Sequence, residues 1–470
     1  MKISPSQSGY RLSLHLAAMA VATATFPLIF LGGLVTSHQA GMSVPDWPNS
    51  WGYNMFLLPP SYWLGRQAGG VFYEHTHRLL GMLAGFASIV LVCLAYGPGR
   101  GERARRGLGW SVVAAVVLAG LSGVAWLALH GSRHLAARMM PHLVVGWAAV
   151  GLVLLTAWLC RVPEERASVR RLAAGILVAV VIQGVLGGLR VVLINLDLAV
   201  VHGCFAQAFF CMTGMMVAMT SRWWPGSARH EGLKARRHGG ELEPSGEESL
   251  RRVFWVAVVA AVVIYGQLVV GAMMRHYQAG LAIPDMPLAY GKLLPPTDAA
   301  GLAQINRQRI LLDDPRIGRV TLGQVWLHFG HRLGAIAVST MLLTLVWTVL
   351  RQARGTALLA RPAWLLLVLL ATQLTLGWLT VTNRKPADIA SYHVAIGAMV
   401  LLVTFTLAVR AKRLTAHPRP AISAERRSMP AGEPAMAWES CGNNSAEGPR
   451  PGPLPVGEDE QPNVELFPHG

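Results

Sequence analysis

The sequence is poor in charged residues, which make up only 14% of its 470 positions, whereas 53% are hydrophobic. Soluble domains are about one quarter charged, so this composition excludes an ordinary soluble enzyme. Acidic residues are especially few, because 24 Asp and Glu stand against 41 Lys and Arg, a net charge of +17. We interpret the excess as basic cytoplasmic loops that orient a membrane protein, and we expect no nucleic-acid partner.

Cysteine is also scarce. The chain has 5 cysteines, and no two of them form a CxxC pair. Four of them lie inside apolar stretches, so the pattern supports neither a disulfide framework nor a zinc site. The chemistry of the chain must therefore be sought in other residue types.

Long apolar runs dominate the sequence, and ten of them are long enough to cross a bilayer as a helix. Because only helices satisfy their own backbone groups in lipid, the runs predict an all-α polytopic membrane protein with about ten transmembrane helices. The runs cover about 12–34, 79–97, 108–129, 140–160, 172–190, 198–220, 253–274, 325–349, 362–382 and 390–409. The first run continues into a motif-bearing loop, so we expect no cleavable signal peptide. The distribution of Lys and Arg predicts a multi-pass protein of the cell (inner) membrane with both termini in the cytoplasm.

The sequence contains an internal repeat that includes polar positions. Residues 38–48 read HQAGMSVPDWP, and residues 276–287 read HYQAGLAIPDMP. Residues 74–78 (EHTHR) match 328–332 (HFGHR), and the Gln-x-x-x-Gly segments at 183–187 and 373–377 precede His202 and His393. Both copies start on the inner side. The repeat therefore predicts two pseudo-symmetric four-helix bundles, related by a twofold axis along the membrane normal.

The repeat divides the chain into parts. We predict an N-terminal half at 1–220, with an inserted helix pair at about 108–160, and a C-terminal half at 253–413. A basic, Gly-rich cytoplasmic linker at 221–252 joins the halves. Residues 414–470 are rich in Pro, Gly, Ala, Ser and Glu and predict a disordered cytoplasmic tail. The sequence does not indicate what the inserted pair does.

Four histidines lie at repeat-related positions near the starts of spans that run inward: His77, His202, His331 and His393. We expect all four at one depth near the outer face, where ionisable residues usually mark function. Two imidazoles that face each other in an apolar bundle suit a bis-histidine haem iron better than zinc, which needs more ligands. Hydrogen-bonded structural histidines are the alternative. His142, in the inserted pair, is a rival ligand to His202.

Charged residues accompany these histidines. Arg78 and Arg332 directly follow two of them, so each guanidinium can pair with a haem propionate or extend to lipid headgroups. Glu74 lies one helical turn before His77, whereas the matching position in the second half is His328. Because a carboxylate lies beside the histidines in only one half, we predict a reacting substrate in the first half and a permanent cofactor in the second. Glu74 would then accept a proton or stabilise positive charge.

Other polar residues of the repeat have expected structural roles. Asp46 and Asp285 stand next to prolines in the matching outer loops, so we expect them to cap the turns, with a role toward a propionate or a proton as the alternative. Gln183 and Gln373 are placed to hydrogen-bond across their bundles. The small residues beside them permit close approach of helices or of a macrocycle.

Taken together, the motifs at 38–48, 74–78, 183–188, 276–287 and 328–332, with His393, resemble those of the haem A synthase family over about residues 20–410. The resemblance implies that His331 and His393, beside Arg332, hold haem b in the second half. It implies that the first half binds the substrate haem O near His77 and His202, beside Arg78, with Glu74 as the important acid. The implied reaction oxidises the C8 methyl of haem O to a formyl group, through successive hydroxylations and loss of water, and supplies haem A to cytochrome c oxidase.

The resemblance also implies partners: haem O, haem O synthase, cytochrome c oxidase assembly factors and membrane lipid, with a homo-oligomer as one candidate assembly. The chain departs from the family in two ways, because members commonly have fewer spans and some carry a cysteine pair in the first outer loop, which is absent here. Two other functions fit the same histidines: a dihaem b-type cytochrome that transfers electrons, and a haem-handling transporter. The sequence indicates neither the electron acceptor nor the oxygen source.

Overall fold

The computed structural model describes residues 10–65, 68–97, 102–128, 164–222, 244–311, 318–353 and 356–415, with Trp224 and a few isolated positions between 143 and 155. In these residues helices are the only regular elements apart from two isolated β-bridges. Nine of the described helices are long and apolar enough to cross a membrane, which confirms the all-α polytopic class. Most of the tenth expected run, at about 140–160, lies outside the described residues, as do His142 and the tail from 416 onward.

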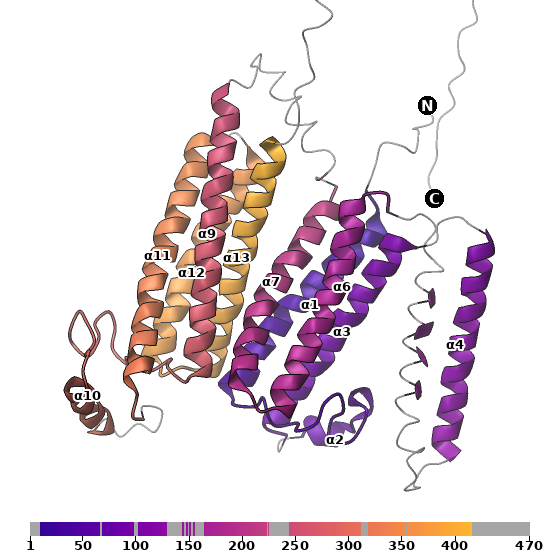
Figure 1. Ribbon diagram of the computed structural model, residues 1–470, viewed down its shortest axis with the longest axis horizontal. Helices are drawn as coiled ribbons and strands as arrows, with labels where there is room; N and C mark the ends of the chain where they lie inside the picture. Colours follow the sequence, from indigo (N-terminus) through magenta and orange to yellow (C-terminus); the bar gives the residue numbers. More distant parts are fainter. Residues whose placement is uncertain are drawn as a thin grey trace, which may run out of the picture. The chain divides into compact units, whose positions relative to one another are not determined.

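Four helices of the N-terminal half form the first bundle (Figure 1). They are α1 (Leu12–Ser37), α3 (Gly70–Tyr96), α6 (Ala167–Val192) and α7 (Leu196–Thr220). Fully buried apolar side chains from all four helices fill its core, including Leu14, Leu91, Ile176 and Met216. The neighbouring pairs are α1 with α3, α3 with α6, α6 with α7 and α7 with α1, so the bundle closes on itself.

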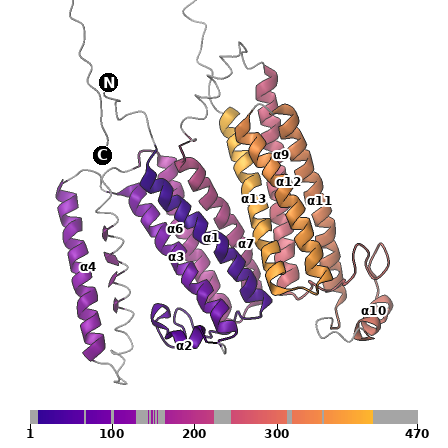
Figure 2. The same cartoon turned by 180° about the vertical axis from the view of Figure 1, so that it is seen from behind.

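Four helices of the C-terminal half repeat this arrangement (Figure 2). They are α9 (Pro244–His276), α11 (Leu322–Gln352), α12 (Ala357–Thr382) and α13 (Ala387–Thr415). Helix α13 also packs against α1 and α7, and α7 packs against α9. A small apolar cluster of Ile29, Phe210 and Ala398 lies where these helices meet, so the two bundles share an apolar contact.

Large apolar side chains cover much of the outer helix surface. Trp110 is 73% exposed, Val262 67% and Ile336 65%, which suits a lipid environment rather than water. Hydroxyl groups within the spans bond to their own helix, as Thr25 does to the carbonyl of Val21 at 2.7 Å. Helix α4 (Glu102–Ala128), the described member of the inserted pair, carries Trp110.

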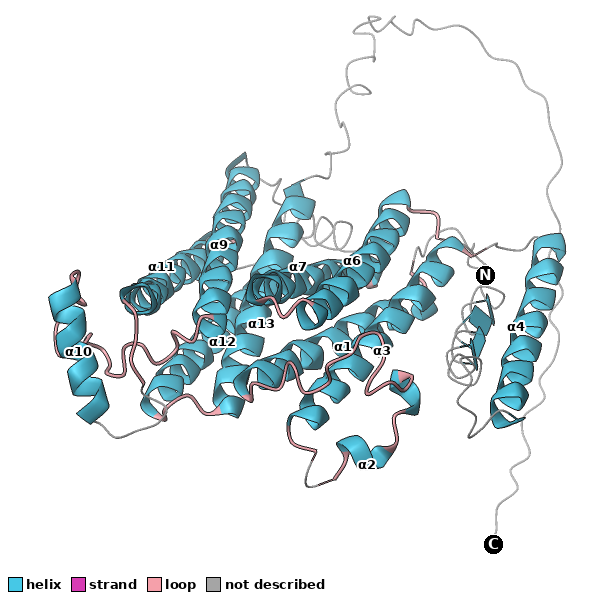
Figure 3. Ribbon diagram, turned by 60° about the horizontal axis from the view of Figure 1, so that its bottom comes forward, coloured by secondary structure: helices cyan, strands magenta, loops and turns pink. Residues whose placement is uncertain are grey.

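The matching outer loops share backbone conformation as well as sequence. Asp46 accepts hydrogen bonds from the backbone N–H groups of Trp51 and Gly52, both at 2.7 Å. Asp285 accepts the equivalent bonds from Tyr290 at 2.8 Å and from Gly291 at 2.9 Å. The prediction that both aspartates cap the loop turns is therefore confirmed. The loops also carry short helices, namely η2 (Met55–Leu57) and α2 (Pro60–Trp63) in the first and α10 (Ala299–Leu311) in the second (Figure 3).

The helices extend beyond the apolar runs that predicted them. Helix α3 begins at Gly70, ahead of the run expected from 79, and α9 begins at Pro244, inside the segment predicted as linker. At α11 a capping box fixes the start, because Gln324 N–H bonds to Thr321 Oγ1 at 3.2 Å and Thr321 N–H to Gln324 Oε1 at 2.9 Å. Hydropathy thus marks the membrane crossing, whereas at α11 a capping group fixes where the helix starts.

Candidate functional site

The structure brings the four repeat-related histidines together in two pairs. The ring centroids of His77 and His202 lie 6.4 Å apart, with 71° between the ring planes. The rings of His331 and His393 are also 6.4 Å apart, at 69°. The first pair joins α3 and α7 and the second joins α11 and α13, so each bundle holds one pair with nearly the same geometry.

Each histidine ring faces a glycine on a neighbouring helix. A methyl group added to any of these glycines would lie 3.0–3.1 Å from the Cε1 atom of the facing histidine, closer than an ordinary van der Waals contact. The pairs are Gly32 with His77, Gly187 with His202, Gly271 with His331, and Gly377 with His393. Glycine at these positions therefore lets each imidazole lie directly against the helix backbone.

A glutamine one turn before three of these glycines contacts the corresponding histidine. Gln183 donates to the carbonyl of His202 at 2.9 Å, and Gln267 donates to the carbonyl of His331 at 2.8 Å. Gln267 Nε2 also lies 3.1 Å from His331 Nδ1, and Gln373 Nε2 lies 3.4 Å from His393 Nε2. Gln267 was not among the residues predicted from the sequence, although residues 267–271 have the same Gln-x-x-x-Gly spacing. The fourth equivalent position is Leu28.

Arg78 and Arg332 hold the outer loops. The guanidinium of Arg78 donates to the carbonyls of Val44, Asp46 and Asn49 at 2.6–2.9 Å. Arg332 donates to the equivalent carbonyls in the second loop at 2.8–2.9 Å, namely those of Ile283, Asp285 and Leu288. Both terminal nitrogens of each arginine are thus engaged by the loop backbone. The sequence prediction paired these two arginines with haem propionates, and the structure gives their terminal nitrogens other partners.

Glu74 and His328 make the same hydrogen bond in the two halves. Glu74 Oε2 accepts from the backbone N–H of Val44 at 2.9 Å, and His328 Nδ1 accepts from that of Ile283 at 3.2 Å. Both side chains are buried, with 4% and 2% of their surface exposed. Glu74 Oε1 also forms an ion pair with Arg78 at 2.8 Å. The first half therefore buries a carboxylate where the second buries a neutral hydrogen-bond acceptor.

The second outer loop is built around a buried arginine that sequence analysis did not single out. Arg309, on α10, donates to the carbonyls of Leu281 and Ala282 at 3.0 Å and to that of Gly318 at 2.8 Å. Burial raises the pKa of the neighbouring Tyr290 phenol. No side-chain motif marks this arginine in the sequence, because its shorter hydrogen bonds go to backbone carbonyls, and the one to the Tyr290 hydroxyl is longer, at 3.4 Å.

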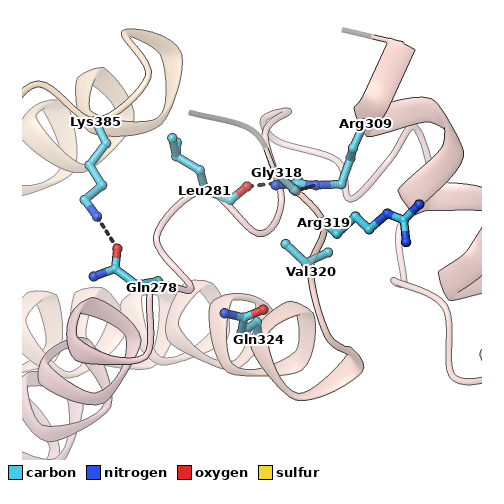
Figure 4. A pocket seen from close by; sticks show the side chains of 8 residues that line it. All are labelled: Gln278, Leu281, Arg309, Gly318, Arg319, Val320, Gln324 and Lys385. Atoms are coloured by element: carbon cyan, nitrogen blue, oxygen red, sulfur yellow. Dashed lines mark hydrogen bonds between the residues drawn. The ribbon is translucent and has the colours of Figure 1, made fainter. Parts of the chain in front are cut away.

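A cavity of about 200 Å³ lies beside this arginine (Figure 4). Its lining includes Gln278, Arg309, Arg319, Gln324 and Lys385. Burial, together with the charge of Arg275, lowers the pKa of Lys385, whose amino group lies 3.4 Å from Gln278 Oε1. The described lining side chains are thus basic or neutral.

The remaining candidate residues do not form a larger ligand cluster. In the part of the chain that the structure describes, no three His, Cys, Asp or Glu side chains come together in a metal-binding group. His38, a loop residue, stacks on Tyr73 with ring centroids 4.3 Å apart. The described residues therefore offer pairs of imidazoles rather than a tetrahedral site.

Comparison with known proteins identifies the family. The model of the COX15-CtaA family, described as cytochrome oxidase assembly protein, matches residues 15–201 and 166–405. The chain belongs to this family. Both histidine pairs and both outer loops lie within the matched residues, and His202 falls inside the second match.

Several curated relatives of this COX15-CtaA family member are named heme A synthase. The chain is 28% identical over 239 residues to the protein of Symbiobacterium thermophilum, covering 50% of this chain and 66% of the relative. It is 30% identical over 167 residues to the protein of a Chelativorans species, covering 35% and 40%. It is also 30% identical over 180 residues to the protein of Rhodopseudomonas palustris strain HaA2, covering 38% and 44%. The matched part of the chain spans less than two thirds of each relative's length.

Proposed function

We propose that the chain is a haem A synthase, which oxidises the C8 methyl of haem O to a formyl group within the membrane. Family membership and the names of the relatives support this function. The observation that carries it is the duplicated pair of facing histidines, at 6.4 Å in each bundle. A reaction on one haem that uses a second haem needs two such sites in one chain.

The residues fit a haem in each bundle. An imidazole nitrogen binds a metal at about 2 Å, so two imidazoles on one iron have ring centroids about 6 Å apart. The observed separations agree with this value. His393 Nδ1 lies 3.2 Å from the carbonyl of Gln373, to which it can donate its proton and so leave Nε2 available to the iron. His77 Nδ1 and His202 Nδ1 are buried without a hydrogen-bond partner among the described groups.

The second half is the proposed cofactor site. His331 and His393 would hold haem b, and haem b bound there would supply one-electron transfer. Glutamines contact both histidines, and the buried neutral acceptor His328 holds the loop beside them. The chain thus orients the ligands without placing an acid next to the site, as suits a permanent electron carrier.

The first half is the proposed substrate site. His77 and His202 would hold haem O, with Glu74 one turn from His77. Conversion of a methyl to a formyl group replaces two hydrogens of the methyl carbon with one oxygen and requires an external oxidant, so a nearby group that accepts the released protons or stabilises positive charge assists it. Glu74 is the buried carboxylate available for this role. Arg78 forms an ion pair with it at 2.8 Å.

The cellular setting is part of the proposal. The positive-inside pattern supports a location in the inner membrane with both termini in the cytoplasm. The partners that the family resemblance implies are haem O synthase, as the source of substrate, and cytochrome c oxidase assembly factors, as acceptors of product. Assembly as a homo-oligomer is also part of the proposal.

Mass analysis of extracted haems tests the function. Membranes of a host that lacks haem A but makes haem O would be compared with and without this protein. Haem A or its hydroxylated precursor, formed only with the protein, is the expected result. A dihaem electron-transfer cytochrome is the second candidate, because the two histidine pairs have nearly identical geometry. Haem-loaded protein that leaves haem O unchanged would favour the cytochrome.

A further inference from the structure

Two arginines at the outer ends of the bundles lie close to the histidine pairs along their helices. Arg190 follows Gly187 by three residues on α6, and Arg275 follows Gly271 by four residues on α9. Spacings of three and four residues keep side chains on one face of a helix. Because these glycines face His202 and His331, each arginine lies one turn outward on the helix face that looks toward a histidine pair.

Neither arginine forms an ion pair with an acidic side chain among the described residues, although Arg190 lies close enough to Glu74 to interact with its charge. Arg190 donates to the carbonyl of Gly41 at 3.1 Å. One terminal nitrogen of Arg275 donates to the carbonyl of Gly33 and to the hydroxyl of Ser37. Arg275 Nε is buried without a hydrogen-bond partner among the described groups. A cation at the membrane edge is costly without a counter-charge, so these guanidinium groups are suited to an anionic ligand.

The two arginines do not occupy equivalent positions in the repeat. The repeat equivalent of Arg190 is Thr380, and that of Arg275 is Thr36. Both threonine hydroxyls bond to carbonyls of their own helices, at 2.7 Å and 3.0 Å. Each half therefore has one arginine and one neutral threonine at these positions, with the two exchanged between helices. The positively charged side chain therefore lies on α6 in the first half and on α9 in the second, which are not equivalent helices in the repeat.

We propose that Arg190 and Arg275 receive the carboxylates of the haems, Arg190 in the first half and Arg275 in the second. This inference rests on the proposed function, because it requires a haem between each pair of histidines. It differs from the sequence-based assignment of the same role to Arg78 and Arg332, in which both terminal nitrogens bond to loop carbonyls, whereas the bonds of Arg190 and Arg275 to described groups use one terminal nitrogen each. An oxyanion at these arginines can also come from a lipid headgroup phosphate, and the test separates the two sources.

The first measurement is the midpoint potential of haem b in the purified full-length protein. Reduction adds an electron, so removal of a nearby positive charge in R275Q should lower the potential. R275K keeps the charge but loses the planar fork, and it should give an intermediate value. R351Q is the charge-matched control, because Arg351 lies in the last turn of α11, far along that helix from His331. R190Q should leave the haem b potential unchanged and reduce the haem O that copurifies.

The second measurement compares protohaem with its dimethyl ester, which lacks the carboxylate charge. The wild-type protein should bind the ester roughly tenfold more weakly than protohaem, as expected for one charge-assisted pair. R275Q should bind both haems equally. If Arg275 instead pairs with a lipid phosphate, the wild-type protein will not discriminate between the two haems, which overturns the inference.

The outcomes separate this inference from the proposed function. A wild-type protein that binds no haem overturns the proposed function and this inference with it. A haem-loaded wild type whose potential is the same in R275Q overturns this inference alone. Where R275Q does not accumulate, R275K replaces it in both measurements. The assignment is contradicted if the haem b potential of R275K equals that of the wild type and R275K binds protohaem and its dimethyl ester equally.

Discussion

The two bundles use the same frame to place histidines and different side chains around them. In both, two imidazoles face each other at 6.4 Å, glycines lie against the rings, and an arginine clamps the outer loop. The bundles differ at three places. Glu74 in the first corresponds to His328 in the second, and Leu28 corresponds to Gln267. The arginine that forms no ion pair among the described residues lies on α6 in the first bundle and on α9 in the second. The geometry of the histidine pairs is thus the same in the two halves, whereas some of the surrounding ionisable groups differ.

The pair of Glu74 and His328 shows what the carboxylate adds. Both side chains accept a hydrogen bond from the same loop position, so anchoring the loop does not require a charge. A buried carboxylate costs free energy unless it is paired, and Arg78 supplies the pairing. The negative charge itself is therefore the property that distinguishes the first half, which is where we propose the reaction occurs.

Removal of a histidine should have the largest effect on this comparison. H331A or H393A should abolish the haem b spectrum of the purified protein, because a bis-histidine iron loses half of its axial ligands. H77A and H202A should leave that spectrum in place. H38A is the control, since His38 stacks on Tyr73 in the loop. A normal haem b spectrum in both H331A and H393A would contradict the assignment of the second half.

Substitution of Glu74 should abolish the chemical difference between the halves. E74A should lower haem A formation by about 10²- to 10⁴-fold, the range for loss of an acid–base group, while the haem b spectrum remains. E74Q keeps an oxygen that can accept the Val44 N–H and removes only the charge. A comparable loss of product in E74Q would assign the effect to the charge, whereas near-normal product would assign it to loop anchoring. Haem extraction and mass analysis provide the measurement.

A methyl group on the ring-facing glycines should affect the two halves separately. G187A pushes against His202 and G271A against His331, at 3.0 Å in each case. Each should cost about 1–3 kcal/mol of stability or displace the ring. We expect G271A to lower the haem b content and G187A to lower product formation with haem b retained. G81A is the control, because a methyl group there meets no neighbouring atom within 4 Å. Equal effects of G187A and G271A on haem b would contradict separate sites.

The smallest expected effect concerns the inner end of the first bundle. Burial opposes ionisation of Glu164, but hydrogen bonds and charge from Arg166, at 2.6 Å, outweigh it and hold the pKa of Glu164 below its usual value. A lowered pKa stabilises the fold above the pKa of the unfolded chain and loses this effect as the pH falls through the folded value. E164Q should therefore lower stability at pH 7 by about 1 kcal/mol or less.

The pH dependence checks this prediction. Thermal unfolding of E164Q and of the wild type in detergent should differ at neutral pH, and the difference should disappear as the pH falls through the lowered pKa of Glu164 in the folded protein. E165Q is the matched control, because Glu165 is adjacent in sequence and exposed. A difference that persists unchanged into acid would show that Glu164 acts through packing rather than charge.

Sequence patterns predicted the spans, the repeat and the identities of the four histidines. These predictions succeeded because apolar length and polar spacing are properties of the chain itself, and the repeat allowed each histidine to be checked against its equivalent. The partners of Arg78, Arg332 and Arg309 could not be predicted in this way. Apart from Glu74, which pairs with Arg78, and the Tyr290 hydroxyl near Arg309, their acceptors are backbone carbonyls, which every residue carries, so no side-chain motif marks them. Gln267 is different, since its spacing to Gly271 was present in the sequence.

The sequence by itself determined that this is a helical membrane protein with two related halves and a histidine pair in each. Charge scarcity and the length of the apolar runs decide the first property, and the matching polar positions decide the second. Only the tertiary structure decided what each charged side chain faces. Arg78 and Arg332 bond to carbonyls of the outer loops, whereas Arg190 and Arg275 form no ion pair with an acidic side chain among the described residues. These contacts depend on how the loops fold back over the helix ends, because groups far apart in sequence meet only there.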